Sequence, residues 1–298
     1  MWELLKTILL GIVEGITEWL PISSTGHMIL VDEFVHLNVS DAFKDLFFVV
    51  IQLGAILAVI FLFWNKIWPF HLKSSAVEPF FKEKDGKPVK GIRAWCNNFV
   101  HMDRIFLWLK IALASVPAAV LGILFDDQID AMLVGNLRAY IVSTALIVYG
   151  VLFIIIESRE HKVTVDTVDA ISYKLALFIG LIQCLALVPG TSRSGSTILG
   201  AALLGTSRLV AAEFSFFLSI PAMVGGSAIK VLMFLMDGHT VTPHELWILA
   251  LGTLVAFVVS VFAIKFLVSY IKKHDFKVFG YYRIVLGVIV LLYFILKA

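Results

Sequence analysis

Long apolar stretches dominate the pattern of hydrophobic and polar positions along the chain. Six of them are long enough to cross the roughly 30 Å hydrocarbon core of a bilayer as helices. They lie at about 46–64, 105–125, 137–156, 213–236, 245–268 and 281–297. Two further apolar regions, 3–36 and 174–205, are interrupted by Pro, Gly and hydroxyl residues, at LPISSTG and VPGTSRSGS. Since such residues break helices, each region is predicted to form a hairpin of two short helical arms.

The two hairpins are predicted to be re-entrant. Non-helical backbone at membrane depth is tolerated only where it is buried in protein or lines a wet cavity. We therefore expect both hairpin tips to face an internal site.

Charged residues orient the predicted spans. The segment 65–104 is rich in Lys and Arg, and the positive-inside rule assigns it to the cytoplasm. The other loops then alternate, with 157–174 and 272–277 inside and 126–130 and 237–245 outside. This alternation of loops is consistent only if the hairpin 3–36 enters and leaves on the outer side and the hairpin 174–205 enters and leaves on the cytoplasmic side.

The chain therefore divides into two units, 1–156 and 174–298, each a hairpin followed by three spans. Because three is an odd number, the second unit is inverted relative to the first, as in many transport proteins. A gapless offset of 169 residues pairs Gly11 with Gly180, Glu14 with Gln183, Ser23 with Ser192 and Gly26 with Gly195. The predicted fold class is an all-α polytopic membrane protein, a single integral membrane domain of two inverted repeats.

Composition agrees with this fold class. The chain is 60% hydrophobic and only 15% charged, which is too apolar for a soluble domain. A net charge of +2 gives no basic surface for nucleic acid. The two cysteines provide neither metal-site spacing nor a disulfide framework. The lipid bilayer is the expected partner, and no nucleic acid is expected.

Glu14 and Glu18 place two carboxylates in the first hairpin. Four residues apart on a helix, they project from the same face. Two buried like charges repel, so they must share a proton, recruit a cation or lie near a fixed positive charge. Each of these is a chemical function, whereas the alternative is a solvated anchor near a helix end.

Arg193 lies in PGTSRSGST, at the tip of the second hairpin. Glycines and hydroxyls there let backbone N–H groups turn toward an anion at a helix N-terminus. Guanidinium donates paired hydrogen bonds to phosphate oxygens. The sequence thus predicts a phosphate clamp made of Gly190, Ser192, Arg193, Ser194 and Thr197. For the hydroxyls, the alternative is a structural role in satisfying backbone freed by the break.

His27 follows Ser24 closely, so the first tip offers a hydroxyl nucleophile and a proton-transfer group together. His27 is itself an alternative nucleophile. Thr25 and Gln52 are expected to support this tip through hydrogen bonds. Together with the clamp and the two carboxylates, these groups favour phosphoryl transfer, which depends mostly on positioning and charge stabilisation.

At these residues the sequence resembles the undecaprenyl pyrophosphate phosphatase family of the bacitracin-resistance type. EGITE, with Glu14 and Glu18, matches the motif E/Q-x-x-x-E, and SSTGH supplies Ser24 and His27. PGTSRSGST matches the motif P-G-x-S-R-S-x-x-T without a gap. The likeness extends over essentially the whole chain, including VVIQLGAILAV at 49–59, and departs locally in the long charged loop 65–104.

The resemblance implies hydrolysis of a C55 isoprenyl pyrophosphate to the monophosphate carrier lipid and inorganic phosphate, for reuse in cell-wall synthesis. It also implies a multi-pass protein of the bacterial plasma membrane, an active site facing outward, a divalent cation such as Mg²⁺ or Ca²⁺, and an optional homodimer. In the resulting hypothesis Arg193 grips the pyrophosphate, Ser24 attacks the terminal phosphorus and His27 assists proton transfer. Glu14 and Glu18 hold the metal or activate water.

A secondary transporter or lipid flippase is the alternative function. Inverted repeats with helices broken at the midplane are typical of that class, and fold alone does not exclude it. A transporter, however, has no need of a hydroxyl and a histidine opposite a phosphate clamp.

Overall fold

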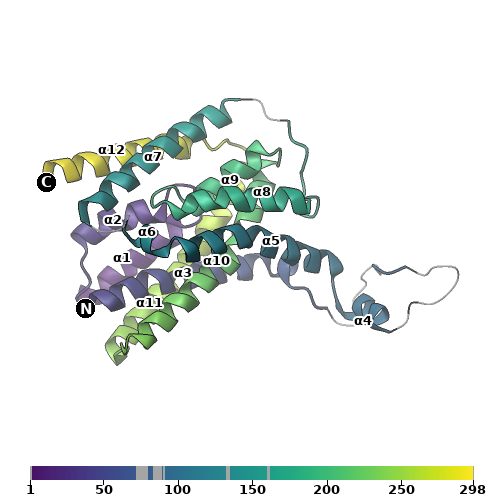
Figure 1. Ribbon diagram of the computed structural model, residues 1–298, viewed down its shortest axis with the longest axis horizontal. Coiled ribbons are helices and arrows are strands. Elements are labelled where there is room, and N and C mark those ends of the chain that lie inside the picture. Colours follow the sequence, from purple (N-terminus) through teal and green to yellow (C-terminus); the bar gives the residue numbers. More distant parts are fainter. Residues whose placement is uncertain are drawn as a thin grey trace.

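The regular elements of the computed structural model are helices (Figure 1). It describes residues 2–71, 80–82, 89, 91–131, 135–159 and 162–297. Parts of the predicted loops 65–104 and 157–174 therefore lie outside the described residues.

Six of the described helices are long and apolar enough to cross a membrane, which confirms the six predicted spans. They are α3 (Asp41–Ile67), α5 (Met102–Leu124), α7 (Gly135–Glu157), α10 (Arg208–Met236), α11 (Pro243–Ile271) and α12 (Lys277–Lys297). Several begin before the predicted apolar run because polar residues cap them. The side chains of Ser40, Ser207 and Thr242 accept hydrogen bonds from the first turns of α3, α10 and α11, as N-caps do.

The two interrupted regions each form two short helices with a break between them. The first consists of α1 (Trp2–Thr17) and α2 (Ser24–Phe34), and the second of α8 (Tyr173–Gln183), the short 3₁₀ helix η1 (Cys184–Leu187) and α9 (Arg193–Leu203). Two further short helices are α4 (Ile92–Phe99) and α6 (Asp126–Ala131). That the hairpins re-enter the membrane, and that the two units are inverted repeats, stay predictions.

The first arm of each hairpin packs on a span of the other unit. A Cβ added to Gly15 on α1 would lie 2.8 Å from the carbonyl oxygen of Ala256 on α11, and one added to Gly180 on α8 would collide with Ala114 on α5. Glycine at such crossings lets two backbones approach closely. The spans α7 and α12 also lie side by side (Figure 1). The two units are thus interlocked through their hairpins.

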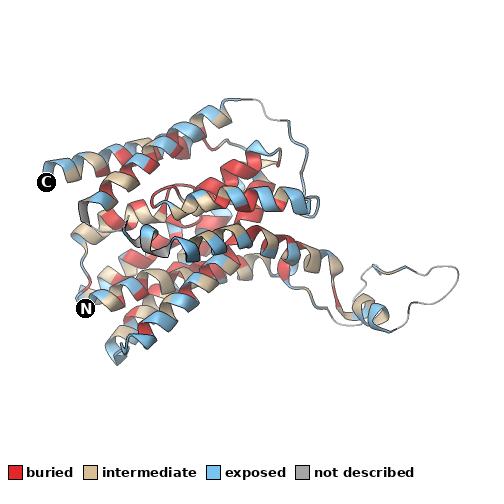
Figure 2. Cartoon of the chain, viewed as in Figure 1, coloured by how far each residue is buried: buried red, intermediate tan, exposed pale blue. Residues whose placement is uncertain are grey.

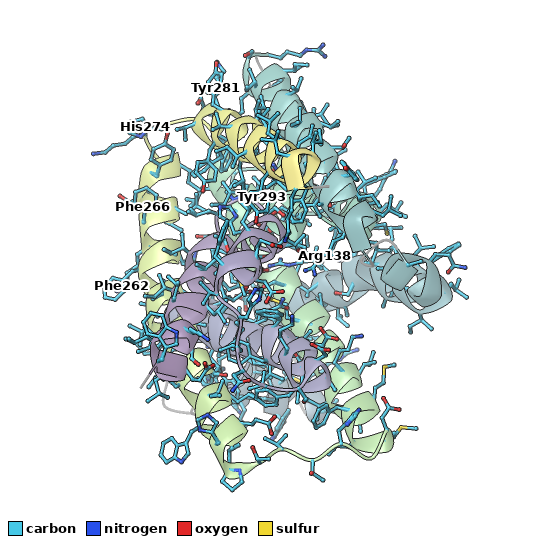
Figure 3. The ribbon with its side chains drawn as sticks, turned by 90° about the vertical axis from the view of Figure 1, so that its left-hand side faces the viewer. Arg138, Phe262, Phe266, His274, Tyr281 and Tyr293 are labelled. Atoms are coloured by element: carbon cyan, nitrogen blue, oxygen red, sulfur yellow. The ribbon has the colours of Figure 1, made fainter. Side chains whose placement is uncertain are left out.

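Buried residues lie in the interior of the helix bundle (Figure 2). Many of the exposed residues on its outside are large and apolar. Trp19, Phe214 and Phe216 lie in the principal buried cluster around the hairpins. On α11, Phe262 and Phe266 are exposed and point away from the bundle (Figure 3). Large exposed apolar side chains on a long helix are expected where lipid, rather than water, is the surrounding solvent.

Candidate active site

Both hairpin tips turn through a serine in the left-handed region of backbone conformation. Ser23 has φ of 71° and Ser192 has φ of 70°, and in the described chain they are the non-glycine residues with positive φ. Each side chain accepts a hydrogen bond from the backbone N–H three residues on, that of Gly26 or Gly195. This conformation costs a serine of the order of 1 kcal/mol or more. Ser23 and Ser192 are thus the N-caps of α2 and α9, which begin immediately after the breaks.

The two tips meet at the carboxylate of Glu18. One of its oxygens accepts a hydrogen bond from Ser24 Oγ at 2.8 Å, and the other accepts one from Arg193 Nη2 at 2.9 Å. Ser194 Oγ also donates to the backbone oxygen of Glu18 at 3.2 Å. The first residues of α2 and α9 are therefore joined through one acidic side chain.

Arg193 is fixed from several sides. Besides Glu18, its guanidinium donates to the backbone oxygen of Ser215 at 3.1 Å and lies over the Trp19 ring, 5.9 Å from the ring centroid. Planar guanidinium held in this way keeps a defined orientation for its donors. The cation is thus positioned before any anion arrives.

A pocket of about 240 Å³ lies beside this ion pair. Seven of its lining residues were predicted from the sequence as site residues: Glu18, Ser24, Thr25, Gln52, Gly190, Ser192 and Arg193. Small or apolar residues, among them Ala186, Ala222 and Gly226, line the remainder. Drug-sized ligands occupy roughly 300–1,000 Å³, so this pocket suits a small polar headgroup, with any long apolar chain left outside it.

Glu14 lies in the last turn of α1, four residues before Glu18, which directly follows that helix, and Glu14 is almost completely buried. Within the described residues, its Oε1 has no hydrogen-bond partner. A buried carboxylate oxygen without a partner is costly unless it holds a proton or a cation. Carboxylates are the ligands that Mg²⁺ and Ca²⁺ prefer, and Mg²⁺ commonly takes one or two of them plus phosphate oxygens and water. Glu14 and Glu18 fit that kind of site.

His27 is hydrogen-bonded to groups other than the Glu18–Arg193 pair. Its Nδ1 donates to the backbone oxygen of Ser23 at 2.8 Å, and its Nε2 lies 2.7 Å from the Tyr282 hydroxyl, with the two rings stacked. Because the carbonyl can only accept, the neutral imidazole carries its proton on Nδ1 and accepts from Tyr282. His27 does not line the pocket. Within the described residues, the hydrogen bonds of His27 do not include Ser24.

Ser194 and Thr197 of the predicted clamp do not line the pocket either. Thr197 Oγ1 donates to the backbone oxygen of Arg193 at 2.9 Å and pairs with Ser215 Oγ at 2.5 Å. These hydroxyls hold α9 against the first tip and against α10. Their geometry matches the structural alternative that the sequence left open.

Arg283 on α12 is a site residue that sequence reasoning missed. It is fully buried, and it donates to the backbone oxygens of Pro21 in the first tip and of Gly190 and Thr191 in the second, at 2.8 to 3.1 Å. It thereby ties both tips to one span. The available signal was an arginine three residues into the predicted span 281–297, since an ionisable residue in such a segment is a functional candidate by default.

Replacing Arg283 with methionine is expected to lower the free energy of unfolding by about 3 kcal/mol, because buried carbonyls lose their donors. Reversible unfolding in mixed micelles measures this loss. Lys277→Met on the same helix is the matched control, since its ion pair with Asp275 is partly exposed and contributes only about 0–1 kcal/mol. Equal stability of the two variants would exclude the bridging role of Arg283.

Comparison with known proteins identifies the family to which this chain belongs. The family model described as bacitracin resistance protein BacA matches residues 7–289. Undecaprenyl-diphosphatase of Enterococcus faecalis is 56% identical over 292 residues, 97% of this chain and 96% of that protein. Undecaprenyl-diphosphatase 1 of Clostridioides difficile (strain 630) is 53% identical over 294 residues, 99% of this chain and 97% of that protein. The chain belongs to the BacA family of bacitracin resistance proteins, which confirms the resemblance seen in its motifs.

Proposed function

We propose that this membrane protein is a phosphatase that hydrolyses undecaprenyl pyrophosphate to undecaprenyl phosphate and inorganic phosphate. The observation that carries the proposal is the carboxylate of Glu18, which is hydrogen-bonded at once to the Ser24 hydroxyl and the Arg193 guanidinium beside a polar pocket. The two relatives that this chain matches over nearly their whole length are named undecaprenyl-diphosphatase and undecaprenyl-diphosphatase 1, which supports this choice of substrate. The product would return to cell-wall synthesis as carrier lipid.

In the proposed reaction, Arg193 binds the oxygens of the terminal phosphoryl group and stabilises the charge that develops there. Ser24 Oγ attacks the terminal phosphorus, and its proton passes to Glu18 Oε2, which lies 2.8 Å away. The bond between that phosphorus and the bridging oxygen breaks, and undecaprenyl phosphate leaves. Water then cleaves the phosphoserine, which releases inorganic phosphate and restores the hydroxyl.

Glu18 replaces His27 as the general base in this account. A general base must lie within hydrogen-bond reach of the proton that it removes, and Glu18 meets that condition for Ser24. The contacts of His27 with Ser23 and Tyr282 favour a role in holding the first tip. His27 as the nucleophile would require the contact of its Nε2 with the Tyr282 hydroxyl to break.

A phosphoryl group is expected on Ser24 when turnover is stopped with acid. Ser24→Ala should reduce phosphate release by at least about 10³-fold, because no other pocket hydroxyl contacts the base. Mass spectrometry of a variant in which hydrolysis of the phosphoserine is slow identifies the modified residue. Thr25→Val is the matched control, since Thr25 lines the same pocket but has no assigned chemistry. A phosphohistidine in Ser24→Ala would instead assign the attack to His27.

A divalent cation, Mg²⁺ or Ca²⁺, is proposed to bind at Glu14 and Glu18. Bound there, it would neutralise phosphate charge. The support is the unpartnered Oε1 of Glu14 together with the neighbouring Glu18 carboxylate.

Glu14→Gln is expected to weaken Ca²⁺ binding by about tenfold or more, since it removes one charged ligand. Titration of the purified protein with Ca²⁺ measures this directly, and the Mg²⁺ dependence of phosphate release follows it. Glu213→Gln is the control, because Glu213 is also buried but is paired with Lys66 at 2.8 Å. Unchanged Ca²⁺ affinity in Glu14→Gln would remove Glu14 from the metal site.

The location in the bacterial plasma membrane and the outward-facing site are proposals that rest on the positive-inside assignment of loop 65–104. Labelling of single cysteines at 127 and 273 with an impermeant reagent tests the orientation. A homodimer is proposed on the family resemblance alone. The transporter or flippase alternative keeps its support in the predicted inverted repeat, but it does not explain a serine held against a carboxylate.

A further inference from the structure

The charged segment 65–104 has no part in the site described above, yet it carries the helix α4 (Ile92–Phe99). At 100° per residue, Ile92, Trp95, Cys96 and Phe99 share one face of this helix, and Arg93, Asn97 and Asn98 lie on the other. No residue of α4 is buried. The helix is therefore amphipathic but lacks a partner for its apolar side within the described structure.

The contacts of α4 with the rest of the loop use its polar side. Asn97 accepts a hydrogen bond from the backbone N–H of Phe81 at 2.9 Å and donates one to the Phe81 oxygen at 2.7 Å. Arg93 lies over the Phe81 ring. On the opposite side, Ile92 is 78% exposed and Trp95 is 51% exposed. The loop thus holds α4 with its apolar face outward.

The position of α4 is close to the expected membrane surface. It ends three residues before α5 begins at Met102, and it lies just beyond the end of that span (Figure 1). Its eight residues span only about 12 Å. Trp64 and Trp68 stack at the end of α3, half exposed, and tryptophans gather where a span meets the headgroups. The bridge between Phe70 and Val100 joins these two span ends.

Charge indicates which surface would cover the apolar face. Segment 65–104 contains eight Lys or Arg residues and four Asp or Glu residues. Basic segments beside a span are attracted to anionic lipids by about 1 kcal/mol per cation. An apolar face with aromatic residues, set in a basic surrounding, is the pattern of a helix that lies in the membrane interface.

We propose that α4 docks its Ile92–Trp95–Phe99 face into the anionic lipid headgroup layer next to the ends of α3 and α5. The lipid partner is defined by its chemistry, a negatively charged headgroup above acyl chains. This surface is separate from the phosphatase site, so the proposal does not depend on the proposed function.

The natural Cys96 lies on the apolar face and can carry a fluorescent label once Cys184 is replaced by alanine. The labelled full chain is reconstituted in vesicles of phosphatidylcholine with or without phosphatidylglycerol, and quenching by spin-labelled lipid is measured. We expect at least about twofold stronger quenching at Cys96 than at a label on Asn98→Cys of the polar side (made in a Cys96→Ser background), with an increase in anionic vesicles. Ile92→Ser with Trp95→Ser should abolish the difference.

Equal quenching at positions 96 and 98 in both kinds of vesicle would overturn the proposal. A label at Cys96 that is shielded from water but not quenched by lipid, together with Cys96–Cys96 crosslinks between copies, would assign the face to a second copy of the chain and would also overturn it.

Discussion

Arg193→Ala is expected to lower kcat for phosphate release from an isoprenyl pyrophosphate by about 10³-fold. The arginine is held in place by Glu18, Ser215 and Trp19 before substrate binds. Its donors therefore act on developing charge without reorganisation. Initial rates of phosphate release from purified protein in detergent, with saturating substrate, measure the loss.

Loss of Arg193 also leaves the buried Glu18 carboxylate without its cation, which destabilises a protein by about 3–5 kcal/mol. Arg193→Lys separates the two effects, because it keeps a positive charge but loses the paired donors. It should fold as the wild type does and still lose at least about tenfold in kcat. The control Arg208→Ala removes an ion pair with Glu157 that lies outside the pocket, in which the arginine is 45% exposed. Wild-type kcat in a folded Arg193→Ala would contradict the clamp.

Glu18→Gln is expected to lower kcat by about 10²–10³-fold with a smaller change in KM. The amide can still accept a hydrogen bond from Ser24, but it cannot take up the serine proton. It also loses the charge that pairs with Arg193 at 2.9 Å. Single-turnover kinetics with a short-chain isoprenyl pyrophosphate separate the attack on phosphorus from product release.

The matched control for this variant is Glu213→Gln, because Glu213 is also a buried glutamate and lies outside the pocket. Activity should fall in Glu18→Gln and stay within about twofold of wild type in Glu213→Gln. A rise in KM for Glu18→Gln with kcat unchanged would show that Glu18 only positions Arg193 and is not the base.

Sequence patterns predicted the spans well because length and apolarity alone decide whether a helix can cross a bilayer. They also located both breaks, where Pro and Gly stand together with several hydroxyl residues, whereas Pro117 and Pro221, without such a cluster, lie inside α5 and α10. The serine pair 23 and 192, found by alignment of the two hairpins, adopts the same backbone conformation and the same capping bond. A local structure such as this serine turn can thus be predicted from the sequence when the same motif occurs in both hairpins.

The direction of side chains beyond a break is not readable in the same way. Helical periodicity fixes the common face of Glu14 and Glu18, but the sequence did not show that Ser24 is hydrogen-bonded to Glu18 and His27 to Tyr282. Arg283 was missed for a different reason. It binds backbone oxygens of both tips. Every residue has a backbone oxygen, so the sequence contains no partner residue type that would point to these contacts.

The most direct test of the central claim is phosphate release from undecaprenyl pyrophosphate by the purified wild-type protein, measured with and without a metal chelator. The account predicts rapid release of one phosphate per lipid, sensitivity to the chelator, and loss of release in Arg193→Ala and Glu18→Gln. A folded wild-type protein that binds the lipid but releases no phosphate in the presence of Mg²⁺ or Ca²⁺ would contradict it, and would favour the transporter alternative.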